Sequence, residues 1–396
     1  MAVTISWALA LNPTGTSGFQ GVANIGGNRL LAVRKDRTVY RSADGGATWA
    51  SLGTVGGAGT VLSRLLSLGT DECLVGVRDD SGNTDVTYRT TDGGDTWVSV
   101  DSVTSAVATG AYGYLRIAAT DEVLAYGFWD PLGIGNPGHH VRRSTDRGVT
   151  WAAGVLIDAA LEGSPAGSGA YINGVVCLGI TAVNAAQIWR STASPWSAWA
   201  SVTPAGNMTG TNRNIWWIEP VSGDIALATG GFINDADLGA SPDFQVLWIW
   251  RTTDKGVTWG RIANASILTP PADNVTAGHI LRVSATVQVV GYGFQDQPHA
   301  TAPGWRATSD AGLTWAVVNT AENPPNGTFY SVAQQVLTDA GLIVAVAALD
   351  EGANGNGEIW LGTVVTGATV QTPNARTAAD GCGHPITHEP CVADEV

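Results

Sequence analysis

The sequence predicts an all-β protein built from one repeated unit. A segment of the form Ser/Thr-x-Asp-x-Gly-x-Thr-Trp occurs five times, at intervals of about 48–56 residues with one interval twice as long. Short strand-like runs precede each copy, and 51 of the 396 residues are glycine, which suits frequent turns. We therefore expect a single seven-bladed β-propeller of four-stranded blades, closed by the N-terminal strand and followed by an irregular C-terminal tail.

The repeated segment has the composition of a hairpin turn between the third and fourth strands of a blade. An aspartate can accept hydrogen bonds from backbone N–H groups of its own turn, and a glycine can adopt a positive φ. The tryptophan that follows is expected to anchor the returning strand in the core. We interpret five aspartates as structural: Asp44, Asp92, Asp146, Asp254 and Asp310.

The blades can be counted along the chain. The long interval contains a degenerate copy in which Ala193 replaces the aspartate and Trp199 follows, which brings the count to six. Residues 358–363 resemble the third strand of a seventh blade that has no fourth strand of its own. The run Ile5–Leu9 resembles the strand that follows a repeated segment, so we expect it to complete blade seven and to leave no open edge. The propeller is predicted to span residues 1–365 and the tail residues 366–396.

The repeated segment resembles the Asp-box, or BNR repeat, of sialidases and related β-propellers of the sialidase-like superfamily. The Arg-Ile-Pro motif of sialidases is absent, although Arg64, Arg116 and Arg282 lie on expected inner strands and leave an arginine grouping open. Xyloglucan-cleaving enzymes and a photosystem assembly factor are similar only in their boxes and blade number. The resemblance therefore implies the fold without the sialidase catalytic motif.

The loops joining second to third strands are expected to surround the central opening on the face opposite the repeated turns. They carry aromatic and acidic residues, namely Trp129, Asp130, Phe232, Asp235, Phe294, Asp296, Asp79 and Asp350. Aromatic faces stack on sugar rings while carboxylates accept hydrogen bonds from hydroxyl groups, so this rim is predicted to bind ligand. A divalent cation such as Ca²⁺ is a second interpretation, and core phenylalanines with turn-capping aspartates are the third.

These observations favour a non-catalytic binding or structural propeller that recognises a glycan or a cell-surface polysaccharide. The alternative is a glycoside hydrolase of the Asp-box type, which needs two carboxylates across a cleft. A sialidase is a weaker alternative, because aspartates on the rim would repel an anionic sugar. No feature singles out one carboxylate pair, so no catalytic residue is assigned.

The net charge of −14 argues against a nucleic-acid partner, and the absence of a long apolar run argues against a membrane span. The first ten residues carry no positive charge and read as a strand, so we expect synthesis in the cytoplasm without a signal peptide. The few lysines and many Ala, Gly and Thr residues suggest a bacteriophage virion or tail protein, hence an extracellular particle. A cytoplasmic or surface lectin is the other interpretation.

The tail contains a second candidate site. Cys382, His384, His388 and Cys391 form the ligand set of a tetrahedral zinc site. A disulfide between Cys382 and Cys391 and two free thiols are the alternatives. We expect the tail to contact a neighbouring structural protein.

Overall fold

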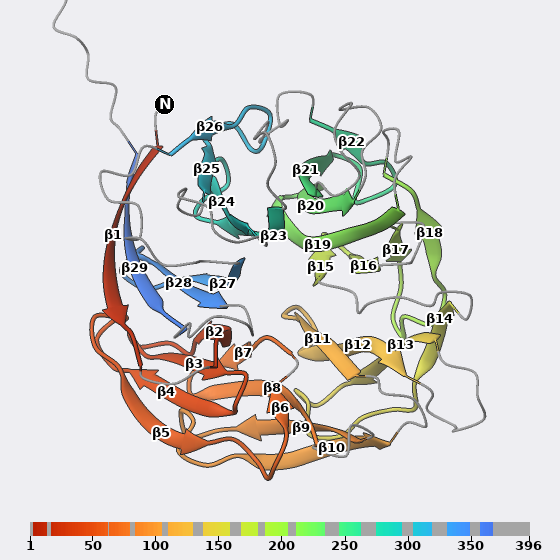
Figure 1. The fold of residues 1–396 in the computed structure, drawn as a ribbon. Coiled ribbons are helices and arrows are strands. Elements are labelled where there is room, and N and C mark those ends of the chain that lie inside the picture. The colour runs from red at the N-terminus through yellow and green to blue at the C-terminus, as the bar shows by residue number, and fades with distance from the viewer. Residues whose placement is uncertain are drawn as a thin grey trace, which may run out of the picture.

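The computed structural model contains seven β-sheets arranged as the blades of a ring (Figure 1). It describes residues 3–13, 17–61, 63–79, 84–104, 110–129, 138–158, 168–180, 187–204, 211–233, 245–262, 275–294, 304–318, 331–348 and 357–366. Within these residues every regular element is a strand, and no helix capable of spanning a membrane is present. The seven-bladed propeller predicted from the sequence is confirmed.

The first four blades run in chain order, each from an inner strand at the channel to an outer strand. Their strands are β2 (Phe19–Asn24), β3 (Leu30–Arg34), β4 (Thr38–Ser42) and β5 (Ala50–Thr54) in blade 1; β6 (Thr60–Val61) with β7 (Leu66–Gly69), β8 (Glu72–Arg78), β9 (Thr84–Thr90) and β10 (Val98–Thr104) in blade 2; β11 (Gly110–Ile117), β12 (Glu122–Trp129), β13 (Gly138–Ser144) and β14 (Val155–Asp158) in blade 3; β15 (Ser168–Ile172), β16 (Val175–Ile180), β17 (Gln187–Ser191) and β18 (Ala200–Val202) in blade 4.

The last three blades complete the ring. Their strands are β19 (Thr211–Ser222), β20 (Ile225–Ile233), β21 (Gln245–Thr252) and β22 (Gly260–Arg261) in blade 5; β23 (Val275–Arg282), β24 (Gln288–Phe294), β25 (Gly304–Thr308) and β26 (Ala316–Val317) in blade 6; β27 (Ser331–Leu337), β28 (Ile343–Ala348), β29 (Ile359–Thr366) and β1 (Val3–Leu11) in blade 7.

The N-terminal strand closes the ring, as the sequence predicts. β1 pairs antiparallel with β29, Ile5 opposite Val364 and Trp7 opposite Gly362 (Figure 1). Ile5 and Trp7 are buried, and the Trp7 ring lies 4.3 Å from the Trp305 ring of blade 6. Pairing the two ends of the described chain in one sheet removes an open strand edge.

The hydrophobic core lies between blades. Strand side chains alternate between the two faces of a sheet, and in a ring each face packs against the neighbouring blade. The buried apolar side chains of the described residues form seven clusters, each shared by two adjacent blades. Burial thus fixes the position of every blade through both of its neighbours.

The repeated segments form the turns between third and fourth strands, and their aspartates organise them. Asp44 accepts hydrogen bonds from the Ser42 hydroxyl (2.8 Å), the Thr48 amide (2.9 Å) and the Thr48 hydroxyl (2.6 Å). The same three kinds of bond recur at Asp92, Asp146, Asp254 and Asp310. These bonds hold the pKa of all five carboxyls below its usual value.

The second glycine of the blade 1 turn also joins two blades. Gly46 has a φ of 96°, and a Cβ atom there would lie 2.8 Å from Cγ2 of Val344 in blade 7. Glycine is therefore required at this position for two reasons, the positive φ of the turn and the close approach of blade 7.

Blade 4 builds its turn differently. Trp199 donates its indole N–H to the carbonyl of Trp196 (2.8 Å), as Trp49 does to Gly46 (3.0 Å) in blade 1. Trp196 thus occupies the place of the glycine and keeps a positive φ of 61°. Its buried side chain packs against blade 3, where the indole N–H donates to Glu122 (2.7 Å).

Candidate functional site

The backbone places three predicted rim segments at the same end of the ring. The second strands of blades 3, 5 and 6 end at Trp129, Ile233 and Phe294, each opposite the start of its inner strand. The repeated turns follow the other end of the third strands, so these strand ends lie on the opposite face. Trp129, Phe232 and Phe294 are therefore placed by their backbone, and their side chains lie outside the description.

Most other predicted ligand-binding residues are outside the described part of the chain. These are Asp130, Asp235, Asp296 and Asp350, together with Cys382, His384, His388 and Cys391 of the tail. The rim, the zinc site and the boundary at residue 365 all stay predictions. In the described ranges, no group of three or more His, Cys, Asp or Glu side chains lies close enough to hold a metal ion.

Asp79 is the one predicted rim carboxylate whose side chain is described. Its carboxylate accepts a hydrogen bond from the Thr84 amide (3.2 Å), and its own amide donates to the Thr84 carbonyl (2.9 Å). Asp79 thus closes the loop between β8 and β9. This contact is the one expected of a turn-capping aspartate.

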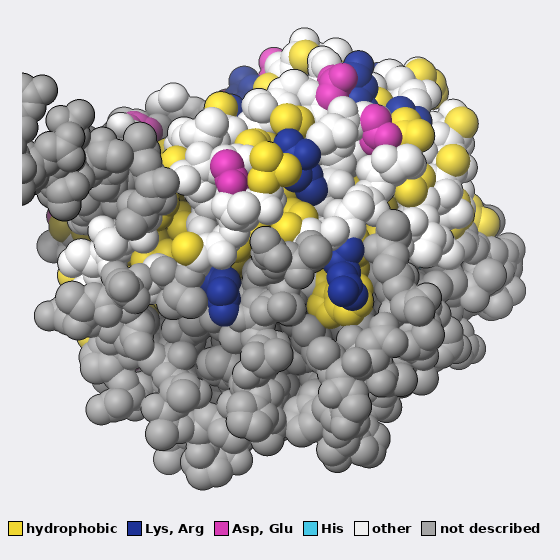
Figure 2. Space-filling model, turned by 90° about the horizontal axis from the view of Figure 1, so that it is seen from above, with side chains coloured by type: hydrophobic (Ala, Val, Ile, Leu, Met, Phe, Trp, Pro, Cys, Tyr) yellow, Lys and Arg dark blue, Asp and Glu magenta, His cyan; other side chains and the backbone are white. Residues whose placement is uncertain are grey.

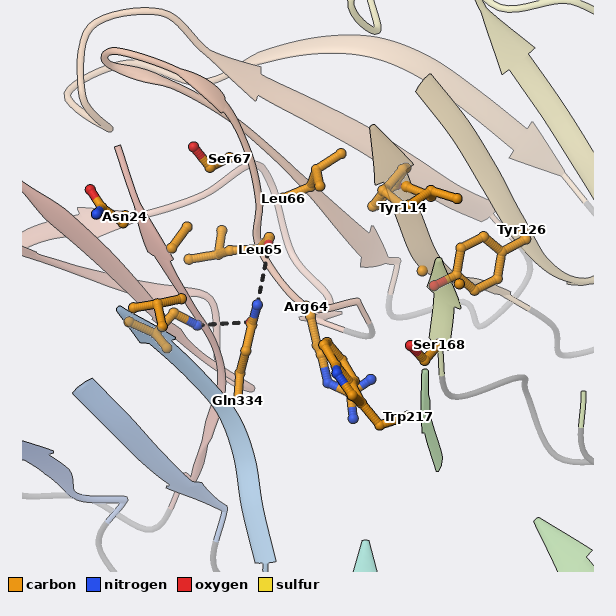
Figure 3. A pocket seen from close by; sticks show the side chains of 16 residues that line it. Asn24, Arg64, Leu65, Leu66, Ser67, Tyr114, Tyr126, Ser168, Trp217 and Gln334 are labelled. Atoms are coloured by element: carbon orange, nitrogen blue, oxygen red, sulfur yellow. Dashed lines mark hydrogen bonds between the residues drawn. The ribbon is translucent and has the colours of Figure 1, made fainter. Parts of the chain in front are cut away.

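A cavity of about 330 Å³ lies in the channel, at the small end of the range for ligand pockets (Figure 3). Its wall comes from β2, the segment 64–67, β11, β12, β15, β19 and β27, hence from six of the seven blades. Bulges interrupt β2, β11, β19, β23 and β27 near this level of the channel. Bulges often redirect side chains beside functional sites.

Three side chains from different blades stack across the channel. The guanidinium carbon of Arg64 lies 4.7 Å from the centre of the Trp217 ring, and Figure 3 shows the two groups overlapping. The imidazole of His279 in blade 6 lies 3.7 Å from the same ring, centre to centre. A cation on an aromatic face is attracted by the ring quadrupole, so Trp217 holds the charge of Arg64 inside the channel.

The charge at this stack is positive. Loss of hydration lowers the pKa of Arg64 to about 10, which leaves the guanidinium protonated at neutral pH. Burial and the charge of Arg64 both push the pKa of His279 well below its usual value, so the imidazole is neutral. Arg64 is thus the charged group of the cavity wall among the residues described.

The side chain of His279 is buried beside Trp217. Its side chain is 3% exposed, and neither ring nitrogen has a partner among the described residues. An unpaired buried polar group costs about 1–3 kcal/mol, and such groups usually meet an ordered water or a ligand. The described residues therefore leave both ring nitrogens of His279 unsatisfied.

Glu219 lies next to the stack. Its carboxylate accepts a hydrogen bond from the Trp217 indole N–H (3.1 Å). Desolvation raises the pKa of Glu219 to about 7, against opposing effects of Trp217 and of the Arg282 backbone and charge. A carboxyl group with this pKa is about half protonated at neutral pH. Strongly shifted pKa values of this kind are common at functional sites.

The three arginines expected on inner strands are not grouped around one point: Arg116 and Arg282 lie on β11 and β23, whereas Arg64 lies in the segment between β6 and β7. Arg64 lies on Trp217, Arg116 pairs with Asp121 (2.6 Å), and Arg282 lies beside Glu219. The sequence analysis missed Trp217, His279 and Glu219. The sequence did offer a signal, since His279 and the tryptophan pair that includes Trp217 stand within apolar inner strands. The repeat pattern, however, does not show that residues of blades 2, 5 and 6 meet in the channel.

Comparisons with known proteins support the fold. No protein-family model and no curated protein sequence matches this chain. Among solved structures, YCF48 bound to a D1 peptide is similar over 90% of this chain and 96% of that chain, with a TM-score of 0.57 and 14% identity. The GH74 xyloglucanase from Xanthomonas campestris has a TM-score of 0.57 and 15% identity over 90% of this chain, which spans 55% of the enzyme.

An α-L-arabinanase from Penicillium chrysogenum, complexed with arabinobiose, is also similar. It has a TM-score of 0.50 and 11% identity over 91% of this chain and 97% of that chain. At such low identity these likenesses show the propeller fold alone, since one fold carries many functions.

Proposed function

We propose that this protein is a non-catalytic binding propeller that recognises a carbohydrate through its rim loops. The observation that carries the proposal is the common end point of β12, β20 and β24. These strands bring the backbone of Trp129, Phe232 and Phe294 to one end of the ring, around the channel. Aromatic residues beside carboxylates suit a sugar, which offers both apolar ring faces and hydroxyl groups.

Two of the structurally similar proteins are consistent with this proposal, because each is related to a saccharide. The arabinanase structure holds arabinobiose, and the GH74 enzyme is a xyloglucanase. The Asp-box character of the repeated turns and membership of the sialidase-like superfamily belong to the same proposal. The second candidate is a glycoside hydrolase, for which Asp130, Asp235 and Asp296 would supply the carboxylates.

A glycan array probed with the purified protein tests the proposal. We expect Trp129→Ala to reduce binding by about tenfold or more, because it removes a stacking face. Val98→Ala is the control, since Val98 is 62% exposed on the outer strand of blade 2, away from the channel. Equal binding by wild type and Trp129→Ala, or no binding to any glycan, would contradict the proposal.

The same glycans separate binding from hydrolysis. Release of reducing sugar by the wild type, lost in Asp130→Asn while binding persists, would replace the binding function with a hydrolase. Binding without product over prolonged incubation supports the binding function.

A further inference from the structure

The cavity in the channel has an apolar surface contributed by three blades. Leu66, Leu115 and Val336 line it from blades 2, 3 and 7, and each side chain is partly exposed. Each of them also packs against the hydrophobic cluster between its own blade and a neighbouring one. The core thus holds these side chains in place, and their remaining apolar surface is accessible in the cavity.

Most polar side chains of the wall are already bonded within the ring. Gln334 accepts a hydrogen bond from the Val22 amide (3.0 Å) and donates to the Leu65 carbonyl (3.3 Å), as Figure 3 shows. Ser168 accepts one from the Ile218 amide (3.0 Å). These bonds join neighbouring blades, so the two side chains serve the structure of the channel.

The same is true of two further polar side chains of the wall. Asn24 donates to the Leu337 carbonyl (2.9 Å) and accepts a hydrogen bond from the Gly26 amide (2.8 Å). The hydroxyl of Tyr114 lies 2.8 Å from the hydroxyl of Thr87. A saccharide needs several hydrogen bonds to replace its hydration, and this wall has few groups left to supply them.

The charged side chain of the wall is engaged as well. The guanidinium of Arg64 lies on the Trp217 ring, and Arg64 has a further interaction with the chain. The indole N–H of Trp217 donates to Glu219 (3.1 Å). A charged ligand would therefore lose its hydration in the cavity without gaining a free partner of opposite charge, which is unfavourable. The wall favours an uncharged ligand.

We propose that the cavity binds an uncharged apolar small molecule that is larger than benzene. An apolar cavity of about 150 Å³ accepts benzene, and the cavity here measures about 330 Å³. The ligand lies along Leu66, Leu115 and Val336 and displaces water from their side chains. This site is separate from the rim and does not depend on the carbohydrate proposal.

Isothermal titration calorimetry with naphthalene and 2-naphthoate tests the site, because the two probes share one ring system and the second alone carries a charge. We expect naphthalene to bind at a single saturable site with a negative heat-capacity change, which marks burial of apolar surface. We expect 2-naphthoate to bind more weakly by about tenfold or more, because its carboxylate loses water for no free partner.

Substitutions in the wall locate the bound probe. Leu115→Asn and Val336→Asn should each lower naphthalene affinity by about tenfold, because an amide replaces part of the apolar contact surface. Leu52→Asn is the matched control, since Leu52 is a partly buried leucine on the outer strand β5, outside the cavity wall. Circular dichroism melting establishes which variants are folded, and either wall variant suffices for the test.

Several outcomes would overturn the proposal. These are no saturable binding of naphthalene, and naphthalene affinity that is unchanged in a folded wall variant. Binding of 2-naphthoate as tight as that of naphthalene would assign the cavity to anions, and displacement of naphthalene by glucose would assign it to sugars. Loss of glycan binding in Trp129→Ala with naphthalene binding intact supports two separate sites.

Discussion

The face of the ring that carries the repeated turns, called the turn side below, differs from the channel in how its ionisable groups are stabilised. On the turn side, each of the five aspartates accepts hydrogen bonds from its own turn. Charges there also pair across blades, Arg29 with Asp71 (2.5 Å) and Arg147 with Glu72 (2.7 Å). Figure 2 shows acidic and basic side chains lying close together on the described surface. The polar groups of this side stabilise one another.

In the channel, burial shifts the pKa of ionisable groups away from their ordinary values. Within the described part of the chain, the His279 ring has no hydrogen-bond partner; the pKa of Glu219 is raised, and that of Arg64 is lowered. The pKa of a carboxyl group thus shifts in opposite directions in the two regions, since that of Glu219 rises in the channel and that of Asp146 falls to about 2 where hydrogen bonds from its turn outweigh burial. The comparison indicates that polar groups of the turn side stabilise the fold, whereas buried ionisable groups of the channel lower the free energy of unfolding, as is common at binding sites.

The largest effect is expected from Trp196, on the turn side. Trp196→Ala should lower the free energy of unfolding by about 3–5 kcal/mol, because it leaves a cavity where a buried indole packed. It also removes a donor from Glu122. Denaturant unfolding measures the change, with Ser197→Ala at the exposed neighbour as control. A loss below about 1 kcal/mol would show that blade 4 does not depend on this contact.

An intermediate effect is expected from the two glycines of the blade 1 turn. Both have positive φ, yet a Cβ at Gly45 meets nothing within 4 Å, whereas one at Gly46 approaches the stiff, buried Val344. Gly45→Ala should cost about 1–2 kcal/mol from backbone strain. Gly46→Ala should cost about 1–3 kcal/mol more from overpacking. Equal losses in denaturant unfolding would mean that the blades separate freely at this point.

The smallest effect is a pH dependence of opposite sign on the two sides. The Glu219 carboxyl has a folded pKa of about 7, above the value of about 4.3 in an unfolded chain. The folded state therefore keeps the proton longer, and wild-type stability should fall as pH rises from about 4.3 to about 7. Glu219→Gln should lack this decline.

Asp146→Asn is the matched variant on the turn side. Its folded pKa of about 2 lies below the unfolded value of about 3.9, so its stabilisation is present above pH 4 and is lost as pH falls toward 2. Melting temperatures of the wild type and both variants between pH 2 and 8 measure these trends. Parallel curves for wild type and Glu219→Gln would contradict the desolvation of Glu219.

The sequence predicted the ring because its signals are local. Each turn keeps its aspartate, glycine, threonine and tryptophan within eight residues, so spacing alone counts the blades. The similarity of Ile5–Leu9 to a fourth strand likewise predicted the closure by β1. The altered turn of blade 4 shows the limit, because the partner of Trp196 is Glu122, 74 residues earlier in the chain.

The sequence by itself determined the all-β class, the seven blades and the strand that closes them, since period, turn chemistry and strand pattern each act over a few residues. The tertiary structure alone decided which side chains meet in the channel. Arg64, Trp217 and His279 come from blades 2, 5 and 6, and only the curvature of the closed ring and the bulges of its inner strands bring them together. Their charge and burial arise from that meeting, because desolvation depends on every blade around the channel.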